Sequence, residues 1–387
     1  MEAGSSIGSR LGWWIAEHRA RRISDPVAKL RFLRGTVGRT HAVGVETRAR
    51  RHWRRAKPAL IAALILLPIP TISDVRRRTA PPPPAVVNAG EPAVAAPKSV
   101  WLVEETKTYE TYSNGLRVEN NYTVGNEERR YPVFDRDDLL LVGWRSAPVG
   151  IVYHTTESHQ APFASEHNRR LRRVGRWLLE YVQRKRSYHF IVDRFGRVHR
   201  IVQETDSANH AGYSVWADAS NVYVNLNSSF IGVSFETETV RTDEGASINQ
   251  AQIHAANVLT QMLRSKYGIA AENCVTHAQV SVYSRAMRVG NHIDWAASFP
   301  FGVLGLGGNY SLPHGAVAVF GFEYGQDFLE ATGEEMWKGM ANGKESFRRL
   351  AAKSGVPVAK YRAARKRKYQ KILEVIEEAK ESREQGT

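Results

Sequence analysis

The feature that most constrains the fold is an alternation of short apolar segments with two amphipathic helices between residues 146 and 300. Apolar runs of strand length predict buried strands, and apolar residues at helical spacing predict helices that cover them. The predicted strands span residues 149–154, 188–192, 197–202, 231–236 and 274–277. The predicted helices span about 165–186 and 248–268, the second opened by a capping box of Ser247 and Gln250. This pattern predicts an α/β domain at 146–312 with a mixed central β-sheet flanked by helices.

The apolar spacing also predicts which helix faces are buried. In the first helix, Trp177, Leu178 and Tyr181 fall on one face together with other apolar residues. In the second helix, Leu259 and Leu263 define the corresponding face. We expect both faces to pack against the sheet.

Residues 99–145 form a β-rich lead-in of unassigned purpose. Polar and apolar residues alternate from Val100 to Tyr112, and a second alternating segment begins at Leu116. The residues between them, Ser113 to Gly115, are typical of a tight turn. The sequence therefore predicts a hairpin or a small sheet before the α/β domain.

The N-terminal region has the pattern of a membrane signal anchor. Residues 1–57 contain 14 of the 54 Lys and Arg residues and 4 of the 39 Asp and Glu residues, so they carry +10 of the net charge of +15. An apolar segment at 58–74 follows, and the excess of positive charge before it predicts a cytoplasmic N-terminus. A cleaved signal peptide and a buried helix of a soluble protein remain alternatives. The Pro- and Ala-rich residues 75–98 predict an extended linker.

The C-terminal region, residues 313–387, is predicted to be helical, most clearly from residue 344 onward. We expect the charged run from Arg365 to Lys368 to be a solvated helix face, with contact to an anionic polymer or lipid as the alternative. Residues 343–365 faintly resemble the helical pair of a LysM wall-binding module.

The residues that could perform chemistry are few. A single cysteine, Cys274, rules out an intrachain disulfide and a multi-thiolate metal site. Two histidines, His154 and His277, end predicted strands, and Asp294 follows in a loop. Two neutral imidazoles and one carboxylate leave a bound Zn²⁺ with net positive charge and a free coordination position, which is the composition of a catalytic zinc site. A structural, hydrogen-bonded role is the alternative for each histidine.

The same segment resembles the zinc-dependent N-acetylmuramoyl-L-alanine amidases of type 2 and the peptidoglycan recognition proteins. Five blocks carry the resemblance, in the order of that family over about 150 residues. They are IVYHTTES at 151–158, YHFIVDRFGRV at 188–198, NHAG at 209–212, FIGVSFETE at 230–238, and THAQVS at 276–281 followed by HIDW at 292–295. The resemblance implies the α/β fold of that family for this segment.

The resemblance also implies roles for individual residues. It implies Zn²⁺ as the cofactor, with His154, His277 and Asp294 as its ligands. Glu236 would be the general base and acid, with the nearby Glu238 as an alternative. Three further residues would act on water or substrate: Tyr188 on the attacking water, His210 at the substrate cleft, and His292 as the oxyanion group. The family usually has a basic residue, often Lys, at the position of His292, and the choice of the third zinc ligand between Asp294 and His292 stays open.

The implied function is a zinc amidase that hydrolyses the amide between N-acetylmuramic acid and L-alanine in peptidoglycan. The expected location is the inner (cytoplasmic) membrane as a single-pass protein, with the catalytic domain on the periplasmic or extracellular side. Peptidoglycan or muropeptides and the membrane are the expected partners, and no nucleic acid is expected because the chain after residue 57 is only mildly basic. A non-catalytic peptidoglycan receptor and a cytosolic muropeptide-recycling amidase are the alternatives, and the oligomeric state stays open.

Overall fold

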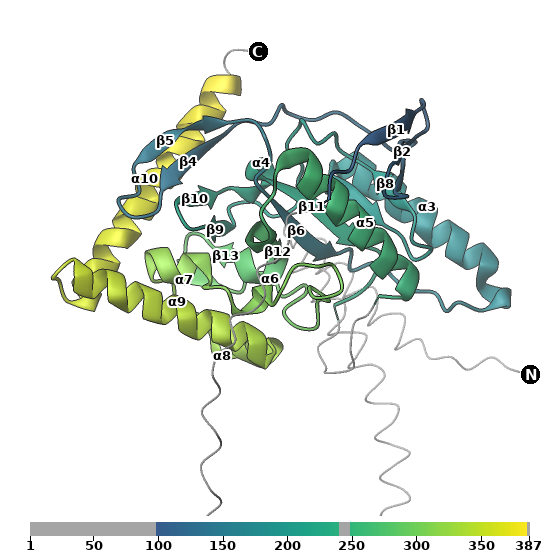
Figure 1. Ribbon diagram of the computed structural model, residues 1–387. Coiled ribbons are helices and arrows are strands. Elements are labelled where there is room, and N and C mark those ends of the chain that lie inside the picture. The colour runs from purple at the N-terminus through teal and green to yellow at the C-terminus, as the bar shows by residue number, and fades with distance from the viewer. Residues whose placement is uncertain (1–97, 240–247, 385–387) are drawn as a thin grey trace, which may run out of the picture. The chain divides into compact units, whose positions relative to one another are not determined.

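The computed structural model describes residues 98–239 and 248–384 of the 387-residue chain (Figure 1). The predicted basic region 1–57, the predicted anchor 58–74 and the predicted linker up to residue 97 lie outside the described residues. Within the described part, no helix has the length and hydropathy needed to cross a membrane.

An eight-stranded mixed sheet forms the centre of the fold, in the order β1-β2-β3-β8-β7-β11-β6-β12. Strands β7, β11, β6 and β12 are parallel to their neighbours within this group, whereas β7 and β8 are antiparallel. The bounds are β1 Leu102–Glu105, β2 Tyr109–Tyr112, β3 Arg117–Glu119, β6 Gly150–Thr155, β7 Phe190–Val192, β8 Val198–Arg200, β11 Phe230–Phe235 and β12 Cys274–Thr276. The predicted α/β class with a mixed central sheet is confirmed.

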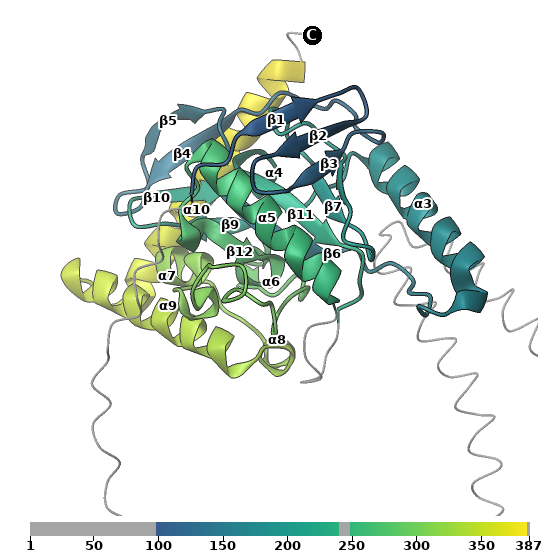
Figure 2. The ribbon, with the colours of Figure 1, turned by 45° about the vertical axis from the view of Figure 1, so that its right-hand side comes forward.

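The first part of the lead-in, β1 to β3, belongs to this sheet, whereas its later strands belong to a second sheet. The predicted turn joins β2 and β3, where the N–H of Gly115 donates to the carbonyl of Tyr112 at 2.9 Å. Gly115 has φ +82°, a conformation that residues with a Cβ adopt reluctantly. Strand β3 then pairs in parallel with β8, so β1 to β3 extend the edge of the sheet (Figure 2).

Two long helices pack against the sheet through alternate strand residues. Helix α5, Gln250–Tyr267, contributes Leu259 and Leu263 to a core with Tyr153 of β6. Helix α3, Asn168–Lys185, contributes Leu178 to a separate core with Ile191 of β7. Because Tyr153 points towards α5, His154, its successor on β6, points to the opposite face of the sheet.

Two details of these helices differ from the prediction. Trp177 and Tyr181 are 59% and 42% exposed, and their rings stack on each other at 5.7 Å instead of joining the core. The predicted capping box at Ser247 and Gln250 is wrong by two residues, because the Asn249 side chain accepts from the N–H of Gln252. The stop of this helix at Gly268, in the left-handed conformation, is confirmed.

A second, antiparallel sheet has the order β5-β4-β10-β9 and was not predicted. Its strands are β4 Tyr131–Asp135, β5 Leu141–Arg145, β9 Val215–Ala217 and β10 Asn221–Val224. A separate pair consists of β13 Val282–Tyr283 and β14 Arg288–Val289. The remaining short elements are α4 Leu226–Ser229, α6 His277–Val280, and the 3₁₀ turns Ser165–His167, Ala271–Asn273 and Asn309–Ser311.

The C-terminal region is helical, as predicted, with α7 Gly315–Phe320, α8 Gln326–Ala331, α9 Glu334–Lys353 and α10 Val358–Glu384. Strands are absent among its described residues, 313–384, so the pair α9–α10 has no flanking strand there. The expectation of a solvated charge run is wrong for Arg365, which is 3% exposed. Its guanidinium donates to the carbonyls of Val319 at 2.9 Å, Asp137 at 2.6 Å and Arg136 at 2.9 Å.

Candidate metal centre

Three elements bring the predicted ligands together at the carboxyl ends of the parallel strands. His154 lies near the end of β6, His277 begins α6 directly after β12, and Asp294 lies in the loop after β14. The Nδ1 atom of His154 is 3.2 Å from Oδ2 of Asp294, and Nδ1 of His277 is 2.9 Å from Oδ1 of Asp294. All three residues are buried, and the structure therefore unites the predicted ligand set in one cluster.

The loop that carries Asp294 forms hydrogen bonds with residues at or next to both histidines. The indole of Trp295 donates to the carbonyl of His154 at 3.0 Å, and the N–H of Ala278 donates to the carbonyl of Asp294 at 3.2 Å. Trp295 has φ +56°, an uncommon conformation for a bulky residue. These contacts hold the carboxylate between the two imidazoles.

The hydrogen bonds around His154 assign its tautomer. Nε2 of His210 lies 3.3 Å from the carbonyl of Phe230, which only accepts, and Nδ1 of His210 lies 3.1 Å from Nε2 of His154. Burial and the neighbouring His154 lower the pKa of His210 well below its usual value, so its ring is neutral. His210 therefore donates from Nε2 and accepts at Nδ1, and His154 donates from Nε2. The lone pair of His154 is then on Nδ1, facing Asp294.

This arrangement fits a metal ion. Nδ1 of His154 has a lone pair and no proton, and it faces the carboxylate of Asp294, which is also a hydrogen-bond acceptor. A cation between the two groups would satisfy both. Donors about 2.0–2.1 Å from a tetrahedral Zn²⁺ lie about 3.3 Å from one another, close to the distances between the imidazoles and the carboxylate. His277 and Asp294 would be the other two ligands.

The electrostatics of the cluster favour the protonation states that ligands need. Burial, aided by the neighbouring His277, lowers the pKa of His154 to about 4. Burial opposes ionisation of Asp294, but His277 and His154 outweigh it and hold the pKa of this carboxyl far below its usual value. A neutral imidazole and a charged carboxylate are the forms that bind metal at neutral pH.

Tyr188 lies against this cluster. Its ring centroid is 5.1 Å from that of His154, and its φ of +63° is an uncommon conformation for an aromatic residue. Such strain in the backbone is concentrated at functional sites. Burial, followed by the charge of Asp294, raises the pKa of Tyr188, so the phenol is protonated at neutral pH.

The other predicted site residues occupy different surroundings. The ring of His292 is exposed and stacks on that of His277 at 4.6 Å, and its position does not make it part of the ligand group. His210, predicted to contact substrate, bonds to His154. Oε2 of Glu236 accepts the N–H of Arg194 at 3.1 Å, at the turn between β7 and β8. Burial raises the pKa of Glu236.

The parallel pairing of β11 with β6 shows a residue that the sequence did not single out. Ser234 is the residue of β11 directly beside His154, two positions before Glu236. Gly232 lies beside Val152 in the same pairing, and a Cβ built on it would lie 2.6 Å from Cγ of His210. Because strand residues alternate between the two faces of a sheet, Ser234 and Gly232 lie on the same face as His154. This assignment needs the register of β11 against β6, which the sequence alone does not give.

The sequence matches a known protein family over part of its length. The family model described as N-acetylmuramoyl-L-alanine amidase matches residues 144–294, a range that ends at Asp294 and contains all three predicted ligands. No curated protein matches the sequence.

Several solved structures are similar to part of this chain at low sequence identity. AmpDH3 of Pseudomonas aeruginosa, in complex with anhydromuramic pentapeptide, is 22% identical, with 41% of this chain and 58% of that chain covered and a TM-score of 0.30. AmiD of E. coli, in complex with an anhydro-N-acetylmuramic acid peptide, is 24% identical, with 35% and 50% covered and a TM-score of 0.27. Drosophila peptidoglycan recognition protein SD is 17% identical, with 35% of this chain and 73% of that chain covered and a TM-score of 0.25. The alignments thus span 58% and 50% of the first two proteins.

The family match and the cluster agree on the same residues. The match covers β6 with His154 and β12 with the adjoining His277, and it ends at Asp294. The structure places these three side chains within reach of one ion. Residues 144–294 thus match the N-acetylmuramoyl-L-alanine amidase family, which the sequence also resembles over this segment.

Proposed function

We propose that the chain is a zinc-dependent amidase that hydrolyses the bond between N-acetylmuramic acid and L-alanine in peptidoglycan. The observation that supports this best is the buried cluster of His154, His277 and Asp294, with distances suited to one tetrahedral ion. A Zn²⁺ ion bound there would supply an acidified water and polarise the scissile carbonyl. Two histidines and one carboxylate leave the open position that such chemistry needs.

In this proposal the remaining residues position and move protons. The Tyr188 phenol is protonated and adjacent to the cluster, so it can donate a hydrogen bond to the attacking water or to the anion that forms on the amide oxygen. His292, when protonated, can help to stabilise the same anion. Glu236 would take a proton from the water and return it to the leaving amine, and its raised pKa suits both steps.

The direct test is digestion of purified muropeptides by the full-length protein, followed by mass spectrometry. We expect release of a peptide with a free L-alanine amine, and loss of this activity after treatment with a chelator and its recovery with zinc. Intact muropeptides after prolonged incubation with the zinc-loaded protein would contradict the amidase proposal.

One observation bears on the alternative of a non-catalytic peptidoglycan receptor: the carboxylate of Glu236, the proposed base, binds the backbone N–H of Arg194. The muropeptide digestion separates an enzyme from a receptor. Glu236→Gln then tests whether Glu236 is the base, with Glu238→Gln as the matched control. If Glu236 is the base, its variant keeps zinc but loses about 10²–10⁴-fold in turnover, whereas the control changes little. If turnover is unchanged in both variants, Glu236 is not the base.

We also propose that residues 58–74 anchor the protein in the cytoplasmic membrane, with the amidase domain outside. The support is the charge asymmetry around this apolar segment. A reporter that is active only outside the cytoplasm, fused after residue 98, should be active. Cytoplasmic activity of a matched reporter would instead support the recycling amidase.

A further inference from the structure

A cavity of about 360 Å³ lies in the C-terminal region, outside the segment that matches the family model. Helices α7, α9 and α10 and the segment after α7 form its walls. Its volume is within the range of about 300–1,000 Å³ that small-molecule sites occupy. The side chains that carry the argument are Phe322, Glu323, Tyr324, Lys344, Arg348 and Arg362.

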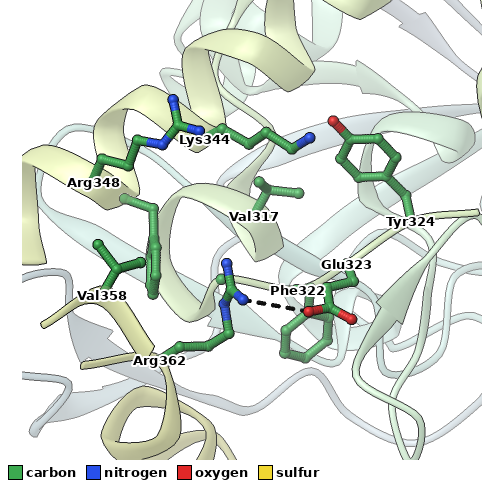
Figure 3. A pocket seen from close by; sticks show the side chains of 10 residues that line it. Val317, Phe322, Glu323, Tyr324, Lys344, Arg348, Val358 and Arg362 are labelled. Atoms are coloured by element: carbon green, nitrogen blue, oxygen red, sulfur yellow. Dashed lines mark hydrogen bonds and ion pairs between the residues drawn. The ribbon is translucent and has the colours of Figure 1, made fainter. Parts of the chain in front are cut away.

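Positive charge dominates this cavity. Figure 3 shows Lys344 and Arg348 along one rim, on α9, with Arg362 of α10 across from them. The one carboxylate, on Glu323, pairs with Arg362 at 3.3 Å. Among the described residues, neither Lys344 nor Arg348 has an ion-pair partner, so two positive charges remain uncompensated.

The guanidinium of Arg362 has donors beyond its bond with Glu323. That bond uses Nη1, which lies 3.3 Å from Oε1 of Glu323. The side chain is 37% exposed, so the outer edge of the guanidinium can still donate to a ligand in the cavity.

Aromatic rings line the same cavity. The ammonium of Lys344 lies 4.4 Å from the ring centroid of Tyr324, and the guanidinium of Arg362 lies 5.7 Å from that of Phe347. Small-molecule sites combine such apolar walls with a few convergent polar groups. A ligand with an anionic group and a compact ring would contact both kinds of surface.

We propose that this cavity binds a phosphate monoester carried on a sugar ring. A phosphate monoester has a charge of about −1.5 to −2 at neutral pH, which matches the two uncompensated cations. Its three terminal oxygens can accept from donors on different walls, as Lys344, Arg348 and Arg362 are arranged. A planar carboxylate is satisfied by one guanidinium fork and would leave the opposite wall unused.

Titration calorimetry of the full-length protein with glucose 6-phosphate tests the proposal. We expect saturable binding that weakens as salt is added, and no binding of glucose at the same concentration. Succinate, a dicarboxylate, should bind more weakly than the sugar phosphate. Absence of saturable sugar-phosphate binding, or tighter binding of succinate, would overturn the proposal.

Variants locate the binding site. Lys344→Gln and Arg348→Gln should each weaken binding about tenfold, because each removes one charged contact to the phosphate. Arg349→Gln is the matched control: Arg349 follows Arg348 on α9 but pairs with Glu345 and does not line the cavity. Equal affinities for all three variants and the parent protein would overturn the assignment, and thermal unfolding checks that each variant is folded.

A phosphate monoester on a sugar could come from the end of a wall glycan or from a soluble sugar phosphate, and a further comparison distinguishes these two sources. Wall glycan that ends in a phosphate monoester is tested for binding before and after phosphatase treatment. Loss of binding after treatment would identify a polymer end as a ligand, whereas binding of glucose 6-phosphate alone would indicate a soluble sugar phosphate. Glycan binding that persists after phosphatase treatment and in Arg348→Gln would contradict recognition of phosphate at this cavity.

Discussion

His154 is oriented by a neighbour that is not a metal ligand. Nδ1 of His210 accepts from Nε2 of His154, and this bond leaves the Nδ1 lone pair of His154 towards Asp294. Partners of this kind fix the tautomer and the ring orientation of a ligand, and their loss typically costs about 10–100-fold in metal affinity.

We therefore expect His210→Ala to lower zinc affinity by about 10–100-fold while His154, His277 and Asp294 remain in place. Competition with a chromophoric chelator measures this affinity. His159→Ala is the control, because His159 is exposed and contacts Arg170 instead of the cluster. Unchanged zinc affinity in His210→Ala would show that His210 does not orient His154.

A glycine provides an independent route to the same effect. A Cβ on Gly232 would lie 2.6 Å from Cγ of His210, so Gly232→Ala must displace that ring. We expect weaker zinc binding although no ligand is changed. Gly175→Ala, on α3, has open space around its added Cβ and should leave zinc binding unchanged. Equal zinc affinities in the two variants would contradict the proposed role of the close contact.

The cluster of His154, His277 and Asp294 could be predicted from sequence, but the surroundings of the other candidate residues could not. His154 and His277 stand at strand ends, and parallel strands bring such positions to one edge. The bond from His210 to His154 depends on the position of a loop far away in sequence, which no local pattern contains. Similarly, the β-turn that binds the Glu236 carboxylate becomes apparent only when β7 and β11 are paired.

At the scale of elements, strands with continuous apolar runs were predictable and the second sheet was not. The residues of β6 and β11 are buried throughout, and both were expected within one residue of their observed bounds. Strand β5 is largely exposed, and β9 has only three residues, so neither gives a clear periodic pattern. Trp177 and Tyr181 were expected to be buried but are exposed. Helical spacing shows which residues share a helix face, but it does not show how far the neighbouring strand extends along that face.

Arg365 shows how one buried side chain connects several elements. Its guanidinium binds the carbonyls of Val319, at the end of α7, and of Arg136 and Asp137, after β4. We expect Arg365→Ala to lower the free energy of unfolding by about 3 kcal/mol, because buried carbonyls lose charged donors. Urea unfolding measures this change.

The matched control for this prediction is Arg367→Ala, two positions along α10, where the side chain is exposed. Surface substitutions of this kind usually change the free energy of unfolding by less than about 0.5 kcal/mol. A similar loss in both variants would attribute the effect to α10 itself instead of the bonds of Arg365.

At the scale of the whole molecule, buried histidines make the stability dependent on pH. His314, directly before α7, is 3% exposed, and neither ring nitrogen has a hydrogen-bond partner among the described residues. Burial lowers the pKa of His314 to about 4. In the unfolded chain this pKa returns to about 6.5, so between these values the unfolded state binds more protons than the folded state.

The contribution of His314 to the free energy of unfolding is therefore unchanged above pH 6.5 and falls by up to about 1.4 kcal/mol per pH unit as the pH decreases towards 4. His314→Phe keeps an aromatic ring and removes the titrating group, so its free energy of unfolding should decrease less than that of the parent protein over this interval. Urea unfolding at pH 7.0 and 5.0, with chelator present to remove the contribution of bound metal, measures both slopes. Parallel slopes would show that His314 is protonated in the folded protein as readily as in the unfolded chain.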